Sequence, residues 1–173
     1  REAAVNDRQK DVRDSAVLGL GLSGQQSEIP FLNSVVCDEK QNTRHRSFAA
    51  FALGLIGGED AGAALLAFAE GAKPGRTATF VNESPELIAS TFVAMGLTGD
   101  AHVLPTLRKA LANAKFDDTV RAFVVLSLGR MKDRESLGEA GRILVVEKDP
   151  GLRRSAAVAL GRMATAADEA ATT

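Results

Sequence analysis

The chain has no tryptophan and no tyrosine, and its 173 residues include one cysteine and two histidines. The single cysteine, Cys37, excludes a disulfide framework within the chain and any metal site built from several cysteines. We interpret it as a small buried residue near the end of a helix. The missing Trp and Tyr side chains are those that most often stack on bases. Their absence is typical of helices that pack through small residues.

The chain also lacks an excess of either charge, because 21 basic residues accompany 22 acidic ones and the net charge is −1. No overall field therefore favours nucleic acid or a membrane surface. The most apolar stretch, residues 48–69, is interrupted by Glu59 and Asp60, so the sequence predicts no membrane segment, and no secretory signal is recognisable. We expect a soluble protein, cytoplasmic if a longer parent chain lacks a signal.

What the chain does contain is an internal repeat, marked by a glycine that recurs after 33, 42, 33 and 32 residues. Around each glycine, mostly apolar residues lie one, five and nine positions earlier, which is the spacing of one helical stripe. An arginine lies eight positions earlier in four of the five repeats. The glycines are Gly21, Gly54, Gly96, Gly129 and Gly161.

Each repeat is predicted to open with a capped helix of about three turns that ends near its glycine. The residues twelve positions before the glycines are Gln9, Asn42, Ser84, Asp117 and Asp149. Four of these are good N-cap types, and Pro85 and Pro150 then fall at the first helical position. In the third repeat, Gly99 allows a turn, Asp100 is a candidate cap, and a second helix follows. The fifth repeat has no large apolar residues for a second helix.

The segment from Asp149 to Gly161 resembles the HEAT-like repeats of the bilin-lyase type, whose pattern is roughly Asp-Pro-x-Val-Arg-x-x-Ala-x-x-Ala-Leu-Gly. The resemblance implies an all-α fold, a right-handed α-solenoid of about five helix pairs with the last incomplete. Ile88 and His45 depart from the pattern, and we expect looser packing at His45. The expected single domain, 1–173, has repeats at 9–40, 41–71, 84–115, 116–148 and 149–173, with an inserted loop at 72–83.

The chain starts with Arg1, and residues 1–7 read like the last turns of a preceding second helix. We therefore expect a fragment of a longer protein. An array cut from its neighbours exposes apolar faces, so its open repeat ends predict self-association.

The function predicted from this architecture is a non-catalytic scaffold that binds a protein partner on a curved helical surface. On the second helices, which usually line the concave side, the candidate partner-binding residues are Asn33, Arg108, Lys109 and Arg142. In the inserted loop the candidates are Lys73, Arg76 and Phe80, with Phe80 as an anchor. The alternative for Phe80 is that it packs back onto the core.

The recurring arginines, Arg13, Arg46, Arg121 and Arg153, are interpreted as a structural ladder between repeats. In HEAT-like proteins this position typically bonds carboxylates and carbonyls of a neighbouring repeat. Asp14, Asp118 and Asp149 are the expected acidic partners. A basic stripe for phosphates or acidic peptides is the alternative.

Catalytic chemistry finds little support, and the sequence predicts no catalytic residue, metal site or cofactor. His45 and His102 form no His-Glu pair, as the di-iron hydroxylase branch of HEAT-like proteins would require, and no His-x-x-x-His spacing occurs. Three alternatives to the scaffold stay open. They are an accessory or lyase-type enzyme of the bilin-lyase HEAT family, a nucleic-acid-binding HEAT-like module, and a spacer between other domains. The balanced charge argues against nucleic acid.

Overall fold

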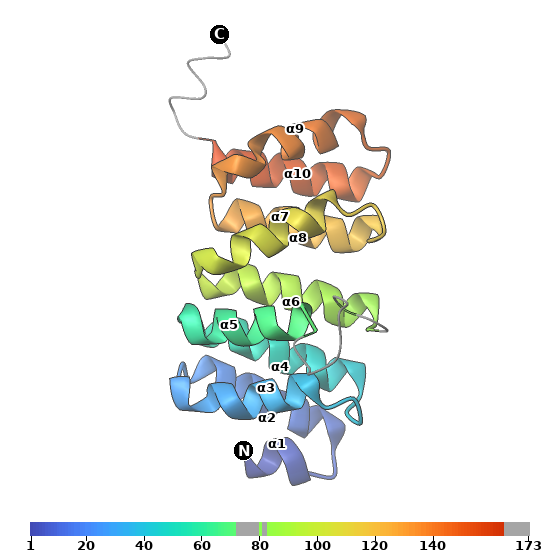
Figure 1. Cartoon of the computed structure of the whole chain (residues 1–173). Helices are drawn as coiled ribbons and strands as arrows, with labels where there is room; N and C mark the ends of the chain where they lie inside the picture. Colours follow the sequence, from blue (N-terminus) through green and yellow to red (C-terminus); the bar gives the residue numbers. More distant parts are fainter. Residues whose placement is uncertain (72–79, 81–82, 165–173) are drawn as a thin grey trace. The chain divides into compact units, whose positions relative to one another are not determined.

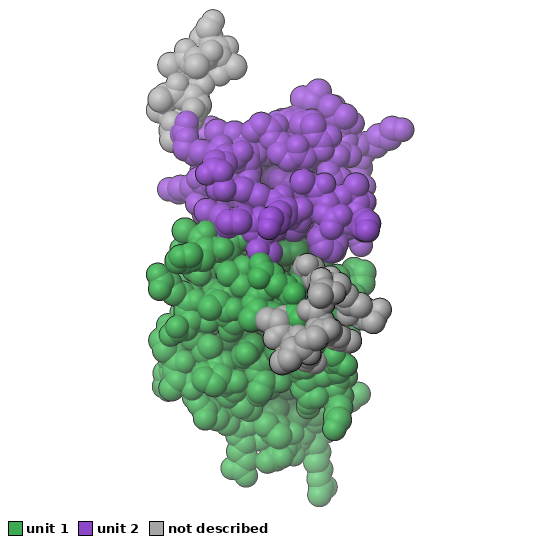
Figure 2. All heavy atoms as spheres, in the orientation of Figure 1, with its two compact units in different colours: residues 1–103 green, residues 104–173 purple. Residues whose placement is uncertain are grey.

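The computed structural model describes residues 1–71, 80 and 83–164, and the regular structure of these residues is helical (Figure 1). The chain divides into two compact units, unit 1 (residues 1–103) and unit 2 (residues 104–173), which Figure 2 colours separately. Along the described ranges, no helix combines the length and the apolar character needed to cross a membrane. The all-helical repeat predicted from the sequence is confirmed.

Unit 1 has two layers of helices. The first helices of its repeats, α2, α4 and α6, pack side by side, and the second helices α3 and α5 lie against them and against each other (Figure 1). The short α1 packs on α2. The elements are α1 (Glu2–Asn6), α2 (Lys10–Leu22), α3 (Ile29–Cys37), α4 (Thr43–Ile56), α5 (Gly58–Ala69) and α6 (Pro85–Thr98), with 3-10 turns at Gln26–Glu28 and Ala101–Val103.

Unit 2 is built in the same way from fewer helices. Its first helices, α8 and α10, pack side by side, while the second helices α7 and α9 pack on α8 and α10 respectively. The elements are α7 (Leu104–Ala112), α8 (Asp118–Arg130), α9 (Leu137–Val146) and α10 (Pro150–Met163), with a 3-10 turn at Arg134–Ser136.

The predicted N-cap side chains are confirmed in four of the five repeats, whereas the side chain of Gln9 makes no capping hydrogen bond within the described residues. The side chains of Asn42, Ser84, Asp117 and Asp149 each accept a hydrogen bond from the backbone N–H three residues later. Such a bond satisfies one of the four N–H groups that a helix start leaves without a partner. Gln9 holds the same position at α2. Local sequence chemistry therefore fixes where four of the first helices begin.

The repeat glycines lie near the helix ends as expected, but the structure gives them a different role from capping. They stand inside the helices, and at Gly21, Gly54 and Gly129 a neighbouring first helix approaches closely, whereas a Cβ on Gly161 would meet no atom of a neighbouring helix within 4 Å among the described residues. A Cβ on Gly21 would lie 2.6 Å from Ala52 Cα, and one on Gly129 would lie 2.6 Å from Ala159 Cα. The same holds for Gly54, at 2.7 Å from Ala94 Cα. Real Cβ contacts are longer than this, so only glycine permits these helices to pack so closely.

The predicted apolar stripe forms the core of both units. In unit 1 it includes Leu53, Leu87 and Met95, and in unit 2 it includes Leu128 and Leu152, all with essentially no exposed surface. Val12 differs, because 39% of its surface stays exposed. It lies on α2, the first long helix of unit 1, which only the five-residue α1 precedes.

His45 corrects the expectation of loosened packing. Its side chain is only 3% exposed, and its Nδ1 lies 2.8 Å from Oδ1 of Asp14 on α2. Asp14 is also buried, and its second oxygen pairs with Arg44 at 3.1 Å. The polar residue at this apolar position is therefore tolerated because it has a hydrogen-bonded partner across the helix interface.

Candidate functional site

The recurring arginines bond to carbonyls at the end of the preceding helix. Arg46 Nε donates to Val36 O at 2.7 Å, Arg121 Nε to Leu111 O at 3.4 Å, and Arg153 Nε to Leu144 O at 2.9 Å. Arg13 donates to Asp7 O, just beyond α1, at 2.6 Å. The last carbonyls of a helix lack intrahelical partners and carry partial negative charge. Each arginine therefore holds the end of one helix against the start of the next.

Two of these arginines also reach a carboxylate that precedes the next first helix. Arg46 forms two bonds to Glu83, at 2.8 and 2.7 Å, and Arg121 bonds Glu147 at 2.9 Å. Of the other acidic partners that the sequence suggested, Asp118 does bond a ladder arginine, whereas the suggestion was wrong for Asp14 and Asp149. Asp14 pairs with Arg44 and His45, Asp118 bonds Arg121 within one helix, and Asp149 caps α10.

The two arginine candidates on the second helices form ion pairs within their own unit. Arg108 on α7 pairs with the buried Asp133 and with Glu135. Arg142 on α9 pairs with Glu139 and Glu147. Burial of Asp133 works against ionisation, but hydrogen bonds from Arg108 and Ser136 outweigh it, and the pKa of Asp133 is lowered. These arginines stabilise unit 2 by pairs that a partner would have to break.

The other two second-helix candidates, Asn33 and Lys109, lie on α3 and α7. Asn33 is half-buried on α3, where its Oδ1 lies 3.7 Å from Sγ of Cys37 at the helix end. Lys109 is exposed on α7. The structure thus offers Lys109 as a surface cation but does not gather the candidates of either unit into a pocket.

The inserted loop is described in part. Lys73 and Arg76 lie outside the described residues. Phe80 is only 7% exposed, and its ring makes edge-to-face contacts with Phe68 and Phe92, with centroid distances of 5.8 and 5.2 Å. The alternative that Phe80 packs onto the core is therefore confirmed, and in this conformation its ring is not open to a partner.

A surface that the sequence analysis overlooked runs along the outer face of the first helices. The residue three positions before each repeat glycine is apolar, yet it stays partly exposed. These residues are Leu18, Phe51, Val93, Leu126 and Val158. The residue six positions before the glycine alternates between serine and phenylalanine along the chain: Ser15, Phe48, Ser90, Phe123 and Ser155. Positions −6 and −3 share one side of a helix, so within each unit the two rows form an outer stripe.

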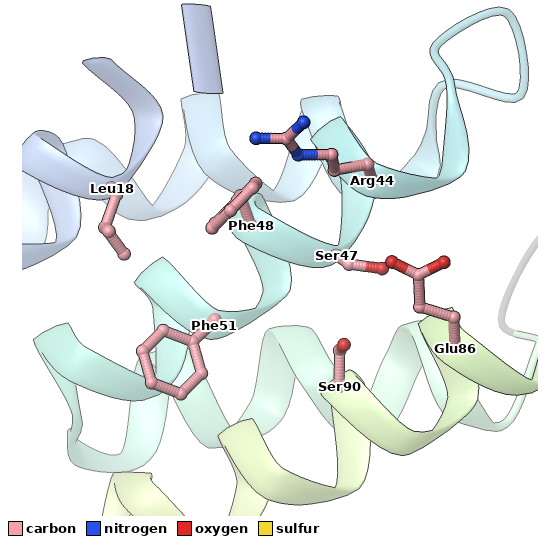
Figure 3. A pocket seen from close by; sticks show the side chains of 7 residues that line it. All are labelled: Leu18, Arg44, Ser47, Phe48, Phe51, Glu86 and Ser90. Carbon is pink, nitrogen blue, oxygen red and sulfur yellow. The ribbon is translucent and has the colours of Figure 1, made fainter. Parts of the chain in front are cut away.

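In unit 1 this stripe is hollowed into a pocket of about 400 Å³, which we call the unit 1 groove. Such a volume lies within the range of pockets that bind small molecules or large side chains. Leu18 of α2 points toward Phe48 and Phe51 of α4, and Glu86 and Ser90 rise from α6 (Figure 3). The lining residues are Leu18, Arg44, Ser47, Phe48, Phe51, Glu86 and Ser90.

Some polar side chains of the unit 1 groove have a partner within the described residues, and others have none. The Arg44 guanidinium lies 5.5 Å from the centre of the Phe48 ring and pairs with Asp11 and Asp14 at 3.2 and 3.1 Å. Ser47 is 7% exposed, and its hydroxyl has no hydrogen-bond partner among the described residues. Glu86 is exposed, and within the described residues it forms no ion pair. The groove therefore combines an apolar floor, a buried unpaired hydroxyl and a free carboxylate.

Unit 2 carries an equivalent hollow, of about 260 Å³, between α8 and α10, which we call the unit 2 groove. Phe123 takes the place of Phe48, and Leu126 takes the place of Phe51. Phe123 is 40% exposed. Others of its lining residues are Thr119, Ala122, Arg154 and Ser155.

The remaining histidine makes a surface pair. His102 Nδ1 lies 2.8 Å from Oδ1 of the buried Asp100, while the imidazole itself is 75% exposed. Asp100 Oδ1 also accepts from the His102 backbone N–H at 3.0 Å, after the left-handed turn at Gly99. In the part of the chain that the structure describes, no three His, Cys, Asp or Glu side chains are grouped to hold a metal ion.

Comparison with known proteins gives a family for these repeats. The family model for HEAT repeats matches residues 1–82 and 104–173. No curated protein matches the sequence. Among solved structures, human deoxyhypusine hydroxylase in complex with glycerol is 17% identical, with a TM-score of 0.47, over 91% of this chain and 81% of that one. That likeness is too low to bear on function.

Proposed function

The chain belongs to the HEAT-repeat family, and from that premise we propose that it is a non-catalytic scaffold that binds a protein partner. The observation that carries the proposal is the unit 1 groove, where Leu18, Phe48 and Phe51 leave apolar surface open beside the unpaired hydroxyl of Ser47. Contiguous exposed apolar surface in a soluble protein typically marks a site of interaction. An aromatic side chain in such a hollow is the usual anchor of an interface.

The helices that carry the groove are held in place before any partner arrives. Gly21 and Gly54 bring α2, α4 and α6 into close contact, and Arg46 joins the end of α3 to Glu83 ahead of α6. A surface fixed in this way loses little conformational entropy on binding, so more of the contact energy is available for affinity.

The groove supports the proposal better than the second helices do. There Arg108 and Arg142 already pair with acidic neighbours, and a partner that used them would first have to displace those pairs. Burial of apolar surface carries no such penalty and contributes about 25 cal/mol for each Å² removed from water. We therefore place the partner surface on the outer stripe of the first helices.

Site-specific crosslinking tests this proposal. A diazirine amino acid similar in size to leucine replaces Leu18 in the groove or, as a matched control, Leu66 on α5, which is also half-buried. Each variant is irradiated in lysate of the source cells. We expect a defined protein to be crosslinked from position 18 and not from position 66, and to be lost when Phe51→Ala is added. Crosslinks from position 66 alone would move the surface to the second helices, and none from either position would overturn the proposal.

A further inference from the structure

We infer that the unit 1 groove recognises a peptide segment in which a large apolar side chain stands next to a lysine or arginine. This inference rests on the proposed function and names the chemistry of the partner. It draws on the charges that line the groove and on the buried hydroxyl of Ser47, which has no hydrogen-bond partner among the described residues.

The charged side chains that line the groove are one guanidinium, that of Arg44, and one carboxylate, that of Glu86. Two further carboxylates lie next to Arg44 but outside this lining, those of the exposed Asp11 and the buried Asp14. Arg44 is already paired with these two, at 3.2 and 3.1 Å. Glu86 is left over, exposed at the first turn of α6. A cation on the partner meets a free carboxylate there, whereas an anion would meet a guanidinium that is already paired.

The floor of the groove selects an apolar anchor. Phe48 and Phe51 come from one helix and Leu18 from its neighbour, so an inserted side chain would touch rings and a branched alkyl group from two directions (Figure 3). A large aliphatic or aromatic side chain would bury the most apolar surface against this floor.

The hydroxyl of Ser47 favours a polypeptide over a purely apolar occupant. A buried hydroxyl without a partner raises the free energy of the empty site. A serine hydroxyl can both donate and accept, and a peptide backbone brings an N–H and a C=O beside every side chain. In Figure 3 the Ser47 hydroxyl lies on the Glu86 side of the groove, where the cation-bearing end of the segment would pass.

Selection from a phage-displayed library of random peptides tests the inference. The purified chain is compared with the variants Phe51→Ala and Glu86→Lys. Glu59→Lys is the matched control, because Glu59 is likewise an exposed carboxylate in the first turn of a unit 1 helix, away from the groove. Circular dichroism on each variant shows whether the helices are retained.

We expect the wild-type chain and Glu59→Lys to enrich peptides that place Lys or Arg beside Phe, Leu or another large apolar residue. Glu86→Lys should instead enrich peptides with Asp or Glu at that place. Phe51→Ala should bind the wild-type peptides at least about tenfold more weakly, as for an anchor contact. Glu86→Gln should weaken them about two- to fivefold, and less at high salt, as for a solvated ion pair.

The outcomes separate this inference from the proposed function. If the enriched peptides depend on Phe51 but show no preference for Lys or Arg, the inference is overturned and the groove remains a binding surface. The same conclusion follows if Glu86→Lys enriches the same peptides as the wild-type chain. Enrichment that is equal on the wild type and on Phe51→Ala would overturn both.

Discussion

The unit 1 and unit 2 grooves are built from equivalent repeat positions and yet differ in character. Phe48 corresponds to Phe123 and Ser90 to Ser155, so the shared part is an aromatic ring beside a serine. The position of Phe51 holds a leucine in unit 2, and the volume falls from about 400 to about 260 Å³. Wherever two first helices pack through a glycine, the repeat produces a hollow, and its side chains decide what that hollow can bind.

The polar residues separate the two grooves further. Arg44 and Glu86 of unit 1 correspond to Thr119 and Gly151 of unit 2, so the charges at these positions are lost. At the other end of the stripe, Leu22, Leu55 and Leu97 of unit 1 give way to the exposed Arg130 and Arg162 of unit 2. Ser47, with its unpaired hydroxyl, becomes Ala122. Both grooves are lined by carboxylates, Glu86 in unit 1 and Asp118 and Asp149 in unit 2, but the stripe ends in leucines in unit 1 and in arginines in unit 2.

The largest predicted effect tests whether the cores of the two units are as similar as their grooves are different. Leu53 and Leu128 hold the same repeat position, and both side chains are fully buried. We expect Leu53→Ala and Leu128→Ala each to lower the free energy of unfolding by about 2–5 kcal/mol, the usual loss for a buried leucine. Chemical unfolding followed by circular dichroism measures this, since the chain has no Trp or Tyr. A loss below about 0.5 kcal/mol at either site would show that its stripe is not core.

A somewhat smaller effect tests the close approach that creates the grooves. A Cβ on Gly54 would meet Ala94, and one on Gly129 would meet Ala159, each within 2.7 Å of a backbone atom. We expect Gly54→Ala and Gly129→Ala to destabilise by about 1–3 kcal/mol through overpacking. Gly19→Ala is the control, because no atom lies within 4 Å of its Cβ position, and it should stabilise α2 by about 0.5–1 kcal/mol. Equal behaviour of the three variants would contradict this packing.

Exchanging Ser47 and Ala122 would make each groove resemble the other. Ser47→Ala removes a buried hydroxyl that has no partner among the described residues, so we expect a gain of about 1 kcal/mol in unfolding free energy. The same variant should weaken peptide binding, because stability at a site is often raised at the expense of its function. Ala122→Ser is the reverse test and should lose stability. If Ser47→Ala were destabilising, the hydroxyl would have to be satisfied in the folded protein.

The smallest predicted effect is the loss of stability of unit 2 in acid. Hydrogen bonds from Arg121 lower the pKa of Glu147, and those from Arg142 lower the pKa of Glu139. A lowered folded-state pKa stabilises the protein above the ordinary carboxyl pKa, and this contribution is lost as the pH falls through the lowered value. We expect α8 and α10 to lose protection in hydrogen exchange as the pH falls below the ordinary glutamate pKa and Glu147 becomes protonated.

Glu147→Gln is the matched variant for that measurement. It should reduce the acid response of α8 and α10 and cost no more than about 1 kcal/mol at neutral pH, because the carboxylate is partly exposed. An unchanged acid response in this variant would show that Glu147 is not the responsible group.

The features that could be read from the sequence are those set within one repeat. The period of the glycines, the caps at Asn42, Ser84, Asp117 and Asp149, and the buried stripe follow from side-chain chemistry over a dozen residues. The outer stripe was also visible in principle, since an apolar residue precedes every repeat glycine by three. It was overlooked because one apolar stripe already accounted for the core of each helix.

Other features needed the tertiary structure, because they join residues far apart along the chain. Arg46 meets Glu83 across 37 positions, Asp14 meets His45 across 31, and no local pattern distinguishes these carboxylates from the acidic residues closer at hand. The grooves depend in the same way on which helices become neighbours. The sequence alone therefore determined a HEAT-like helical repeat and where four of the first helices begin, since caps and periodicity act locally. The packing of α2, α4 and α6 decided which apolar side chains stayed exposed, since burial is a property of the assembled helices.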